Sequence, residues 1–205
     1  MTSVTSPTRR RIGRPESPEL RGNVLRAAID AYAEKGWSGF NFDVVATRAG
    51  VGRPALYRRW ADRTALLVDA FKELTPSLVD EDLGSLRQEL VRLGVDYATM
   101  MRGSRGLAGT RLMADAHFHP DLFARVSAEV SERREDLVQR SVERARARGE
   151  IADDCTRDIT LLLFGALWER SALAATGRAM HAERPDVEHL VDVVLRGLGQ
   201  GPDVV

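Results

Sequence analysis

The stretch Phe42–Arg63 reads FDVVATRAGVGRPALYRRWADR and decides the fold of the chain. Its pattern predicts a short helix over Phe42–Ala49, a turn at Gly50–Gly52 and a second short helix over Arg53–Trp60. Two short helices joined by a glycine-containing turn form a helix-turn-helix, and the second helix has the right size for the major groove of DNA. The stretch therefore indicates a unit that reads DNA.

The segments on either side of this unit carry helix signals of their own. Ser17 is suited to cap a first helix that runs to about residue 35, and Gly36 is suited to end it. Asn41 can cap the first helix of the unit, and Asp62 can cap a further helix over Arg63–Leu74. We expect these flanking helices to support the helix-turn-helix.

The remainder of the chain is helical throughout, without a convincing alternating strand. We therefore predict an all-α fold in three parts. These are a disordered basic arm over residues 1–17, a three-helix helix-turn-helix DNA-binding domain over residues 18–75, and a larger helical domain over residues 76–205. The expected helices of the larger domain cover residues 83–102, 106–118, 120–148, 154–176 and 185–199.

Charge is divided unevenly along the chain, although the net charge is zero. Residues 1–72 hold 13 of the 30 Lys and Arg and 7 of the 30 Asp and Glu, a net charge of +6, so residues 73–205 carry −6. This asymmetry suits an N-terminal end that meets a polyanion. Arginine greatly outnumbers lysine, which fits phosphate and guanine contacts, but a GC-rich genome gives the same bias and is the explanation that we prefer.

A set of residues between positions 24 and 71 matches a known family pattern. The matching marks are Ala28, Tyr32–Gly36, Val45–Ala46, Ala49–Val51, Leu56–Tyr57, Trp60, Asp62–Arg63 and Leu66. On these residues the segment resembles the N-terminal DNA-binding domain of the tetracycline-repressor (TetR) family of bacterial regulators. The departures are mild: Gly52 replaces the usual Ser or Thr cap, Pro54 a common Gly, Trp60 a Phe and Arg63 a Lys.

Within this resemblance, the second helix of the unit is expected to enter the major groove. Arg53 and Arg58 can each fork onto a guanine, and Ala55 can touch a thymine methyl group. The tripeptide at residues 13–15 resembles a minor-groove arm, for which a solvated tail is the alternative. For the helix arginines the alternative is surface ion pairing, and for Tyr57 it is packing. The predicted DNA contacts are Arg14, Asn41, Arg53, Pro54, Ala55, Tyr57, Arg58, Arg59 and Arg63, of which Asn41, Tyr57, Arg59 and Arg63 are assigned to phosphates.

The last two expected helices predict a homodimer. Residues 159–175 are apolar nearly all round, and Val187, Leu190, Val191, Val194, Leu195 and Leu198 form a stripe. We expect two copies of the chain to pair through the helices at about 154–176 and 185–199. Family resemblance further implies that the larger domain binds a small-molecule effector. The candidate lining residues are Tyr97, Met100, Met101, Met113, Phe118, Phe164 and Trp168, and ordinary core packing is the alternative for each of them.

Other classes of site find less support. Asp115, His117 and His119 do not make a zinc ligand set, so we expect no metal and no cofactor. Four arginines between residues 140 and 148, interleaved with glutamates, predict a solvated, ion-paired helix face. No catalytic motif or membrane span is recognised, and we expect a cytoplasmic protein. By family resemblance, the predicted function is a regulator, most often a repressor, that binds a palindromic double-stranded DNA operator and is released from it by the effector. The alternatives are an architectural DNA-binding protein and an all-helical enzyme.

Overall fold

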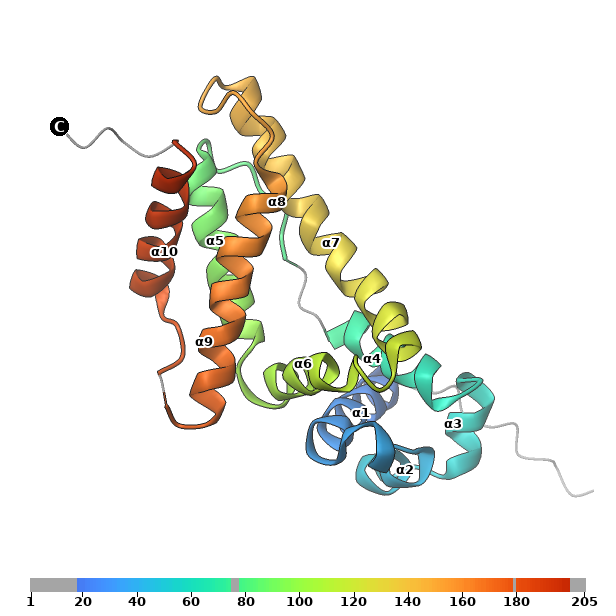
Figure 1. Cartoon of the computed structure of the whole chain (residues 1–205). Coiled ribbons are helices and arrows are strands. Elements are labelled where there is room, and N and C mark those ends of the chain that lie inside the picture. The colour runs from blue at the N-terminus through green and yellow to red at the C-terminus, as the bar shows by residue number, and fades with distance from the viewer. Residues whose placement is uncertain (1–17, 75–77, 179, 200–205) are drawn as a thin grey trace, which may run out of the picture.

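The computed structural model describes residues 18–74, 78–178 and 180–199, which form helices and connections with no strand among them. Helices α1 to α4 gather at one end, α5, α9 and α10 stand together at the other, and α7 slants between the two groups (Figure 1). The elements are α1 (Pro18–Gly39), α2 (Phe42–Ala49), α3 (Arg53–Arg59), α4 (Arg63–Leu74), α5 (Leu86–Met100), α6 (Gly103–Asp115), α7 (Pro120–Ala147), α8 (Thr156–Ile159), the π-helical turn η1 (Thr160–Phe164), α9 (Gly165–Ala175) and α10 (Arg184–Gly197).

The first core lies between α1, α2, α3 and α4. Tyr32, Leu56 and Leu66 are fully buried in it, as the apolar positions of these helices predict. Leu112 of α6 and Val126 of α7 belong to the same core, so the small N-terminal helices are packed directly onto the larger part of the chain. The predicted boundary at residues 75–76 falls outside the described residues and stays a prediction.

Helix α1 breaks at Gly36, where the sequence predicts its end. Gly36 has φ 65° and ψ −175°, and the chain then makes a further turn to Gly39. A Cβ atom at Gly36 would lie 2.7 Å from Nη1 of Arg111, the end of a flexible side chain that can move aside, so it is the backbone angle that requires glycine. The break turns the backbone of Trp37 toward α6. The predicted cap, Ser17, lies outside the described residues.

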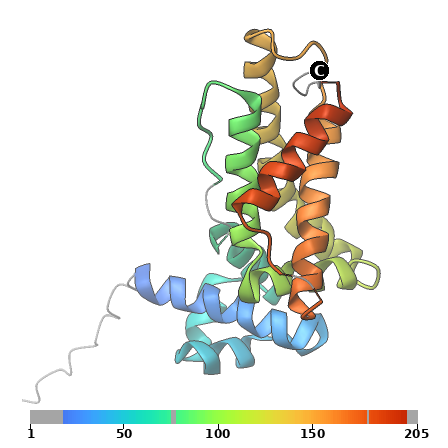
Figure 2. The same cartoon turned by 90° about the vertical axis from the view of Figure 1, so that its left-hand side faces the viewer.

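The second core lies among α5, α7, α8, α9 and α10. Leu90, Val138, Ile159 and Val191 are fully buried in it. Figures 1 and 2 show α10 beside α5 and α9. The single helix predicted over residues 154–176 is instead divided into α8, η1 and α9. A π-helical turn of this kind inserts an extra residue into a helix and is frequently found at functional sites.

The charged face of α7 differs from the prediction of a solvated surface. Arg144 donates to Oε2 of Glu89 through Nε and Nη2, at 3.0 and 2.6 Å, and Arg148 donates to Oε1 of the same side chain at 3.1 Å. Glu89 is only 2% exposed. Hydrogen bonding to Glu89 raises the pKa of Arg144. These arginines therefore join α7 to α5 around a buried carboxylate.

Candidate DNA-binding surface and effector pocket

Local capping fixes the geometry of the helix-turn-helix. Oδ1 of Asn41 accepts the backbone N–H groups of Asp43 and Val44, each at 3.0 Å, so Asn41 caps α2 as predicted. Gly50 ends α2 in the left-handed conformation, with φ 66°. Gly52 precedes α3 and provides no side-chain cap, as expected for a residue in place of Ser or Thr. The two helices are thus held at a fixed turn.

Two buried side chains anchor α3. Leu56 is fully buried, and Trp60, which follows the last helical residue, donates its indole N–H to Oδ2 of Asp69 at 3.0 Å. The guanidinium of Arg59 lies 5.6 Å from the centre of the Trp60 ring. Because these contacts use one side of α3, the opposite side is turned outward at the end of the molecule remote from α10 (Figures 1 and 2).

The outward side of α3 presents Arg53, Pro54, Tyr57 and Arg58, all of them exposed. The ring of Tyr57 is 63% exposed and meets Phe42 edge to face, with ring centres 4.7 Å apart. Packing against Phe42 therefore fixes the orientation of the Tyr57 ring while most of the side chain stays accessible. These four residues form what we call the α3 face.

Arg53 is engaged by a neighbour in the free protein. Its Nε lies 2.6 Å from Oδ1 of Asp43, and the two side chains are 64% and 49% exposed. An exposed pair of this kind contributes little free energy and is easily exchanged. Arg53 can therefore leave Asp43 for a guanine or a phosphate at small cost.

Three of the other predicted DNA contacts have internal roles. Nη1 of Arg63 donates to the carbonyl oxygens of Trp37 and Phe40 at 3.0 and 2.8 Å, and its guanidinium lies 4.0 Å from the centre of the Trp37 ring. Arg63 thus closes the connection between α1 and α2, so its predicted phosphate contact stays a prediction without support from this geometry. Ala55 is half-buried beside α1, and the acceptor atom of Asn41 is used in capping. Arg14 lies outside the described residues.

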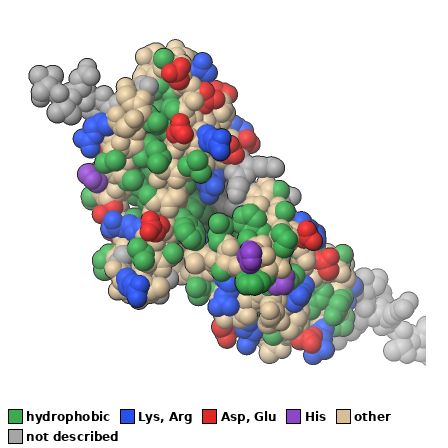
Figure 3. Space-filling view, viewed as in Figure 1, with side chains coloured by type: hydrophobic (Ala, Val, Ile, Leu, Met, Phe, Trp, Pro, Cys, Tyr) green, Lys and Arg blue, Asp and Glu red, His purple; other side chains and the backbone are tan. Residues whose placement is uncertain are grey.

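The second site is a cavity of about 370 Å³ that opens between α6, α7 and α9. Figure 3 shows hydrophobic side chains gathered around a hollow near the middle of the molecule. Its wall includes six of the seven residues predicted to line a pocket, namely Tyr97, Met100, Met101, Met113, Phe164 and Trp168. Their binding of an effector stays a prediction. Phe118 does not line the cavity, because it lies in the turn after α6 and is 75% exposed.

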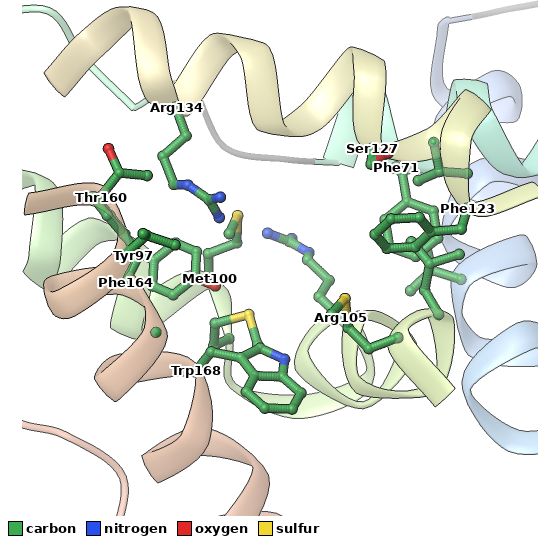
Figure 4. Close-up of a pocket in the computed structure, with 18 residues that line it drawn as sticks. Phe71, Tyr97, Met100, Arg105, Phe123, Ser127, Arg134, Thr160, Phe164 and Trp168 are labelled. Atoms are coloured by element: carbon green, nitrogen blue, oxygen red, sulfur yellow. The ribbon is translucent and has the colours of Figure 1, made fainter. Parts of the chain in front are cut away.

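The sequence prediction missed several residues of the cavity wall. Ile29 of α1 and Phe71 of α4 reach it from the DNA-binding helices, and Phe123 reaches it from α7. Arg105 of α6 and Arg134 of α7 supply its charge, and Figure 4 shows their guanidinium groups directed toward each other across the open centre. The π-helical turn η1 brings further residues to the same wall, and no sequence signal marks that turn.

Arg134 is held in place by aromatic rings. Its guanidinium lies 5.8 Å from the centre of the Tyr97 ring and 5.3 Å from that of Phe164. Burial raises the pKa of Tyr97, and the positive charge of Arg134 opposes that shift. Nε of Arg134 and Nε1 of Trp168 are both buried without a hydrogen-bond partner.

Helix α6 connects the cavity wall to the DNA-binding helices. Oδ2 of Asp115, at its C-terminal end, accepts the hydroxyl group of Tyr32 at 2.8 Å and the backbone N–H of Trp37 at 3.2 Å. Burial and the hydrogen bond to Asp115 raise the pKa of Tyr32, which therefore stays a neutral donor. The Tyr32 ring also meets the cavity residue Phe71 edge to face, at 6.2 Å. We call the contact of Asp115 with Tyr32 and Trp37 the α6–α1 clamp.

The helices predicted to form a dimer leave apolar side chains uncovered. Leu162, Leu173 and Val193 are 52%, 40% and 45% exposed.

Within residues 18–74, 78–178 and 180–199, no group of three His, Cys, Asp or Glu residues could hold a metal ion. Over the same residues, no helix is long and apolar enough to cross a bilayer.

Known proteins match both the helix-turn-helix and the part of the chain that holds the cavity. Residues 24–70 match the family model described as bacterial regulatory proteins, tetR family, and residues 80–194 match the tetracyclin repressor-like C-terminal domain. The HTH-type transcriptional regulator AqdR of Rhodococcus erythropolis is 30% identical over 155 residues, which cover 72% of each protein. The structure of the TetR-family transcription regulator SCO0332 is 26% identical, with a TM-score of 0.64, and covers 87% of this chain and 98% of that one.

A crystal structure of a TetR-family regulator from Rhodococcus sp. has the same fold, with a TM-score of 0.69 at 23% identity over 86% of this chain and 96% of that one. These relatives are transcriptional regulators and not enzymes. The two family models together span the helix-turn-helix and the larger helical part that holds the cavity. The chain therefore belongs to the TetR family of bacterial regulatory proteins and is a DNA-binding transcriptional regulator.

Proposed function

We propose that this regulator is a repressor that binds a palindromic operator as a homodimer and is released from it by a small-molecule effector. The observation that carries the proposal is the position of the cavity. Ile29 and Phe71 belong to the DNA-binding helices, yet both form part of its wall. A molecule that fills the cavity would therefore contact the DNA-binding helices directly.

The α3 face supplies the proposed DNA contacts. Arg53 and Arg58 are exposed on it and can each bind O6 and N7 of a guanine, a contact that contributes about 1–3 kcal/mol of discrimination between bases. Tyr57 lies between them in sequence, and its exposed ring edge suits a phosphate or sugar contact. Arg59, which contacts the Trp60 ring at the edge of this face, is proposed to bind a phosphate.

A second copy of the chain is proposed to cover the exposed apolar residues of η1, α9 and α10. Leu162 and Leu173 lie eleven residues apart, about three helical turns, and Val193 presents a similar side chain on α10. To read one operator, the two α3 faces of such a dimer must lie on the same side of it. Half-sites about 34–36 Å apart, one turn of DNA, are the spacing that such a dimer reads.

Effector release is proposed to act through α6. This helix contributes Arg105, Leu112 and Met113 to the cavity and holds α1 through the α6–α1 clamp. A ligand that shifts α6 would move α1 and the helix-turn-helix packed on it. A ligand changes operator affinity only if it binds the two positions of α6 with different affinity.

Selection of binding sites from random double-stranded DNA tests this function. The full chain is incubated with a pool of random duplexes, bound duplexes are recovered and sequenced, and the protein copies per selected duplex are counted by native mass spectrometry. We expect an inverted repeat that is occupied by an even number of chains. Recovery of duplexes without a shared motif would favour an architectural DNA-binding protein and contradict the proposed operator.

A further inference from the structure

The effector cavity holds two positive charges in a wall that is otherwise mostly apolar. Eighteen residues line it, and the only ionisable groups among them that carry charge at neutral pH are Arg105 and Arg134. Figure 4 shows the two guanidinium groups entering from opposite sides and pointing toward each other. No described residue forms a salt bridge with either of them. Two cations that face one another without an anion repel each other.

Hydrogen-bond donors at the same place are also unsatisfied. Nε of Arg134 is buried and has no acceptor, and the indole Nε1–H of Trp168 is in the same situation. A buried donor without a partner costs about 1–3 kcal/mol, so such groups are usually paired. Both donors belong to lining residues, but neither atom is accessible to water, so an acceptor of a ligand reaches them only when these side chains turn toward the cavity.

Apart from Ser127, Thr160 and the polar atoms of Tyr97 and Trp168, the rest of the wall is apolar. Aromatic rings of Tyr97 and Phe164 hold Arg134 from one side, and Phe71 and Phe123 form the opposite end of the cavity (Figure 4). A fully hydrated small anion would leave this surface in contact with water. A molecule with an apolar body and one anionic group would cover the rings and place its charge between the arginines.

We propose that the effector is an amphipathic organic anion, whose carboxylate or similar acidic group lies between Arg105 and Arg134 while its apolar body lies against the aromatic wall. This inference rests on the proposed effector function and adds the chemical class of the molecule. Arg105 belongs to α6 and Arg134 to α7. An anion that binds both arginines draws α6 toward α7, and α6 carries Asp115, the residue that holds α1.

A pair of naphthalene dyes tests the charge preference. The probes are 8-anilino-1-naphthalenesulfonate, which carries one negative charge, and N-phenyl-1-naphthylamine, which has the same ring system without it. Binding of each dye is measured by fluorescence with the full chain and with Arg134→Met and Arg105→Met. Arg133→Met is the matched control, because Arg133 is exposed on the same helix, next to Arg134, and does not line the cavity.

We expect Arg134→Met and Arg105→Met to weaken the anionic dye by roughly ten- to a hundredfold, the loss of a charge-assisted hydrogen bond, and the neutral dye by less than threefold. Arg133→Met should change neither. Equal effects on both dyes, no effect on the anionic dye, or no binding of either dye would overturn the inference. Because DNA is absent from this assay, its result is independent of operator binding, which the selection of duplexes tests separately.

Discussion

The hydroxyl group of Tyr32 links the cavity side of the molecule to its DNA-binding side, so its removal is the most informative single change. Tyr32→Phe keeps the buried ring and its edge-to-face contacts with Phe40 and Phe71, at 6.0 and 6.2 Å. It removes only the donor that lies 2.8 Å from Oδ2 of Asp115. The change therefore isolates one bond of the α6–α1 clamp.

The expected loss of stability follows from the partners of Asp115. A hydrogen bond to a charged group contributes about 1.5–3 kcal/mol. Asp115 is half-buried and keeps the backbone N–H of Trp37 at 3.2 Å, so its carboxylate is not left alone. We therefore expect Tyr32→Phe to lower the free energy of unfolding by about 1.5 kcal/mol, the lower end of that range.

Urea denaturation followed by circular dichroism measures this loss. Tyr57→Phe is the matched control, because the Tyr57 side chain is 63% exposed, and surface changes of this kind stay within about 0.5 kcal/mol. Combining Tyr32→Phe with Asp115→Asn in a double-mutant cycle should give a coupling of about 1 kcal/mol or more. Equal stability of Tyr32→Phe and Tyr57→Phe would refute the idea that this bond fastens α6 to α1.

Three further predictions concern the larger part of the chain. Arg144→Met should lower the free energy of unfolding by about 3 kcal/mol in urea denaturation, because Glu89 would stay buried with Arg148 as its remaining partner; a loss below about 0.5 kcal/mol would contradict this. Leu162→Arg should give a monomer in sedimentation velocity with unchanged helicity, whereas Val79→Arg, at a similarly exposed residue outside these helices, should leave the dimer intact; a dimeric Leu162→Arg protein would contradict the proposed interface. Burial alone would raise the pKa of Asp80, but hydrogen bonds from Arg144 and Arg140 lower this pKa overall. The ionised Asp80 therefore stabilises the folded protein above the unfolded pKa of about 3.9, and this contribution is lost as the pH falls through the folded pKa. The stability difference between the natural protein and Asp80→Asn should therefore be full at pH 7 and shrink as the pH is lowered below about 3.9, and a difference that does not shrink would contradict the assignment.

The helix-turn-helix could be predicted from sequence because its determinants are local. Asn41 caps the residues that follow it directly, Gly50 supplies the left-handed turn, and Asp62 accepts the backbone N–H of Ala65 at 2.7 Å. Each of these interactions spans three residues or fewer or depends on a single backbone angle. Such features are written in short stretches of sequence, which is why α2 and α4 begin and end where predicted.

The role of Arg63 could not be predicted in the same way. Its Nη1 binds carbonyl oxygens that lie 26 and 23 residues earlier in the chain, at the break that Gly36 makes in α1. An arginine at the start of a helix, close to a DNA-reading unit, is equally suited to a phosphate by sequence alone. Only the packing of α4 against the end of α1 distinguishes the two roles.

The positive charge of the cavity could not be predicted from the sequence for a related reason. Arg105 and Arg134 belong to two helices rich in polar residues, where an arginine is ordinarily a solvated side chain. Their approach depends on the angle between α6 and α7. Phe118 illustrates the opposite error, because an aromatic residue favours a buried position, but the turn after α6 leaves it 75% exposed.

Operator binding by the α3 face is the central claim, and fluorescence anisotropy with a selected operator duplex tests it most directly. The natural protein, Arg58→Ala and the control Arg133→Ala are titrated with the operator and with a scrambled duplex at one salt concentration. The account predicts at least about a thousandfold preference for the operator in the natural protein and the control, and a loss of about 1–3 kcal/mol of that preference in Arg58→Ala. Equal affinity of the natural protein for both duplexes, or an Arg58→Ala protein with unchanged preference, would contradict it.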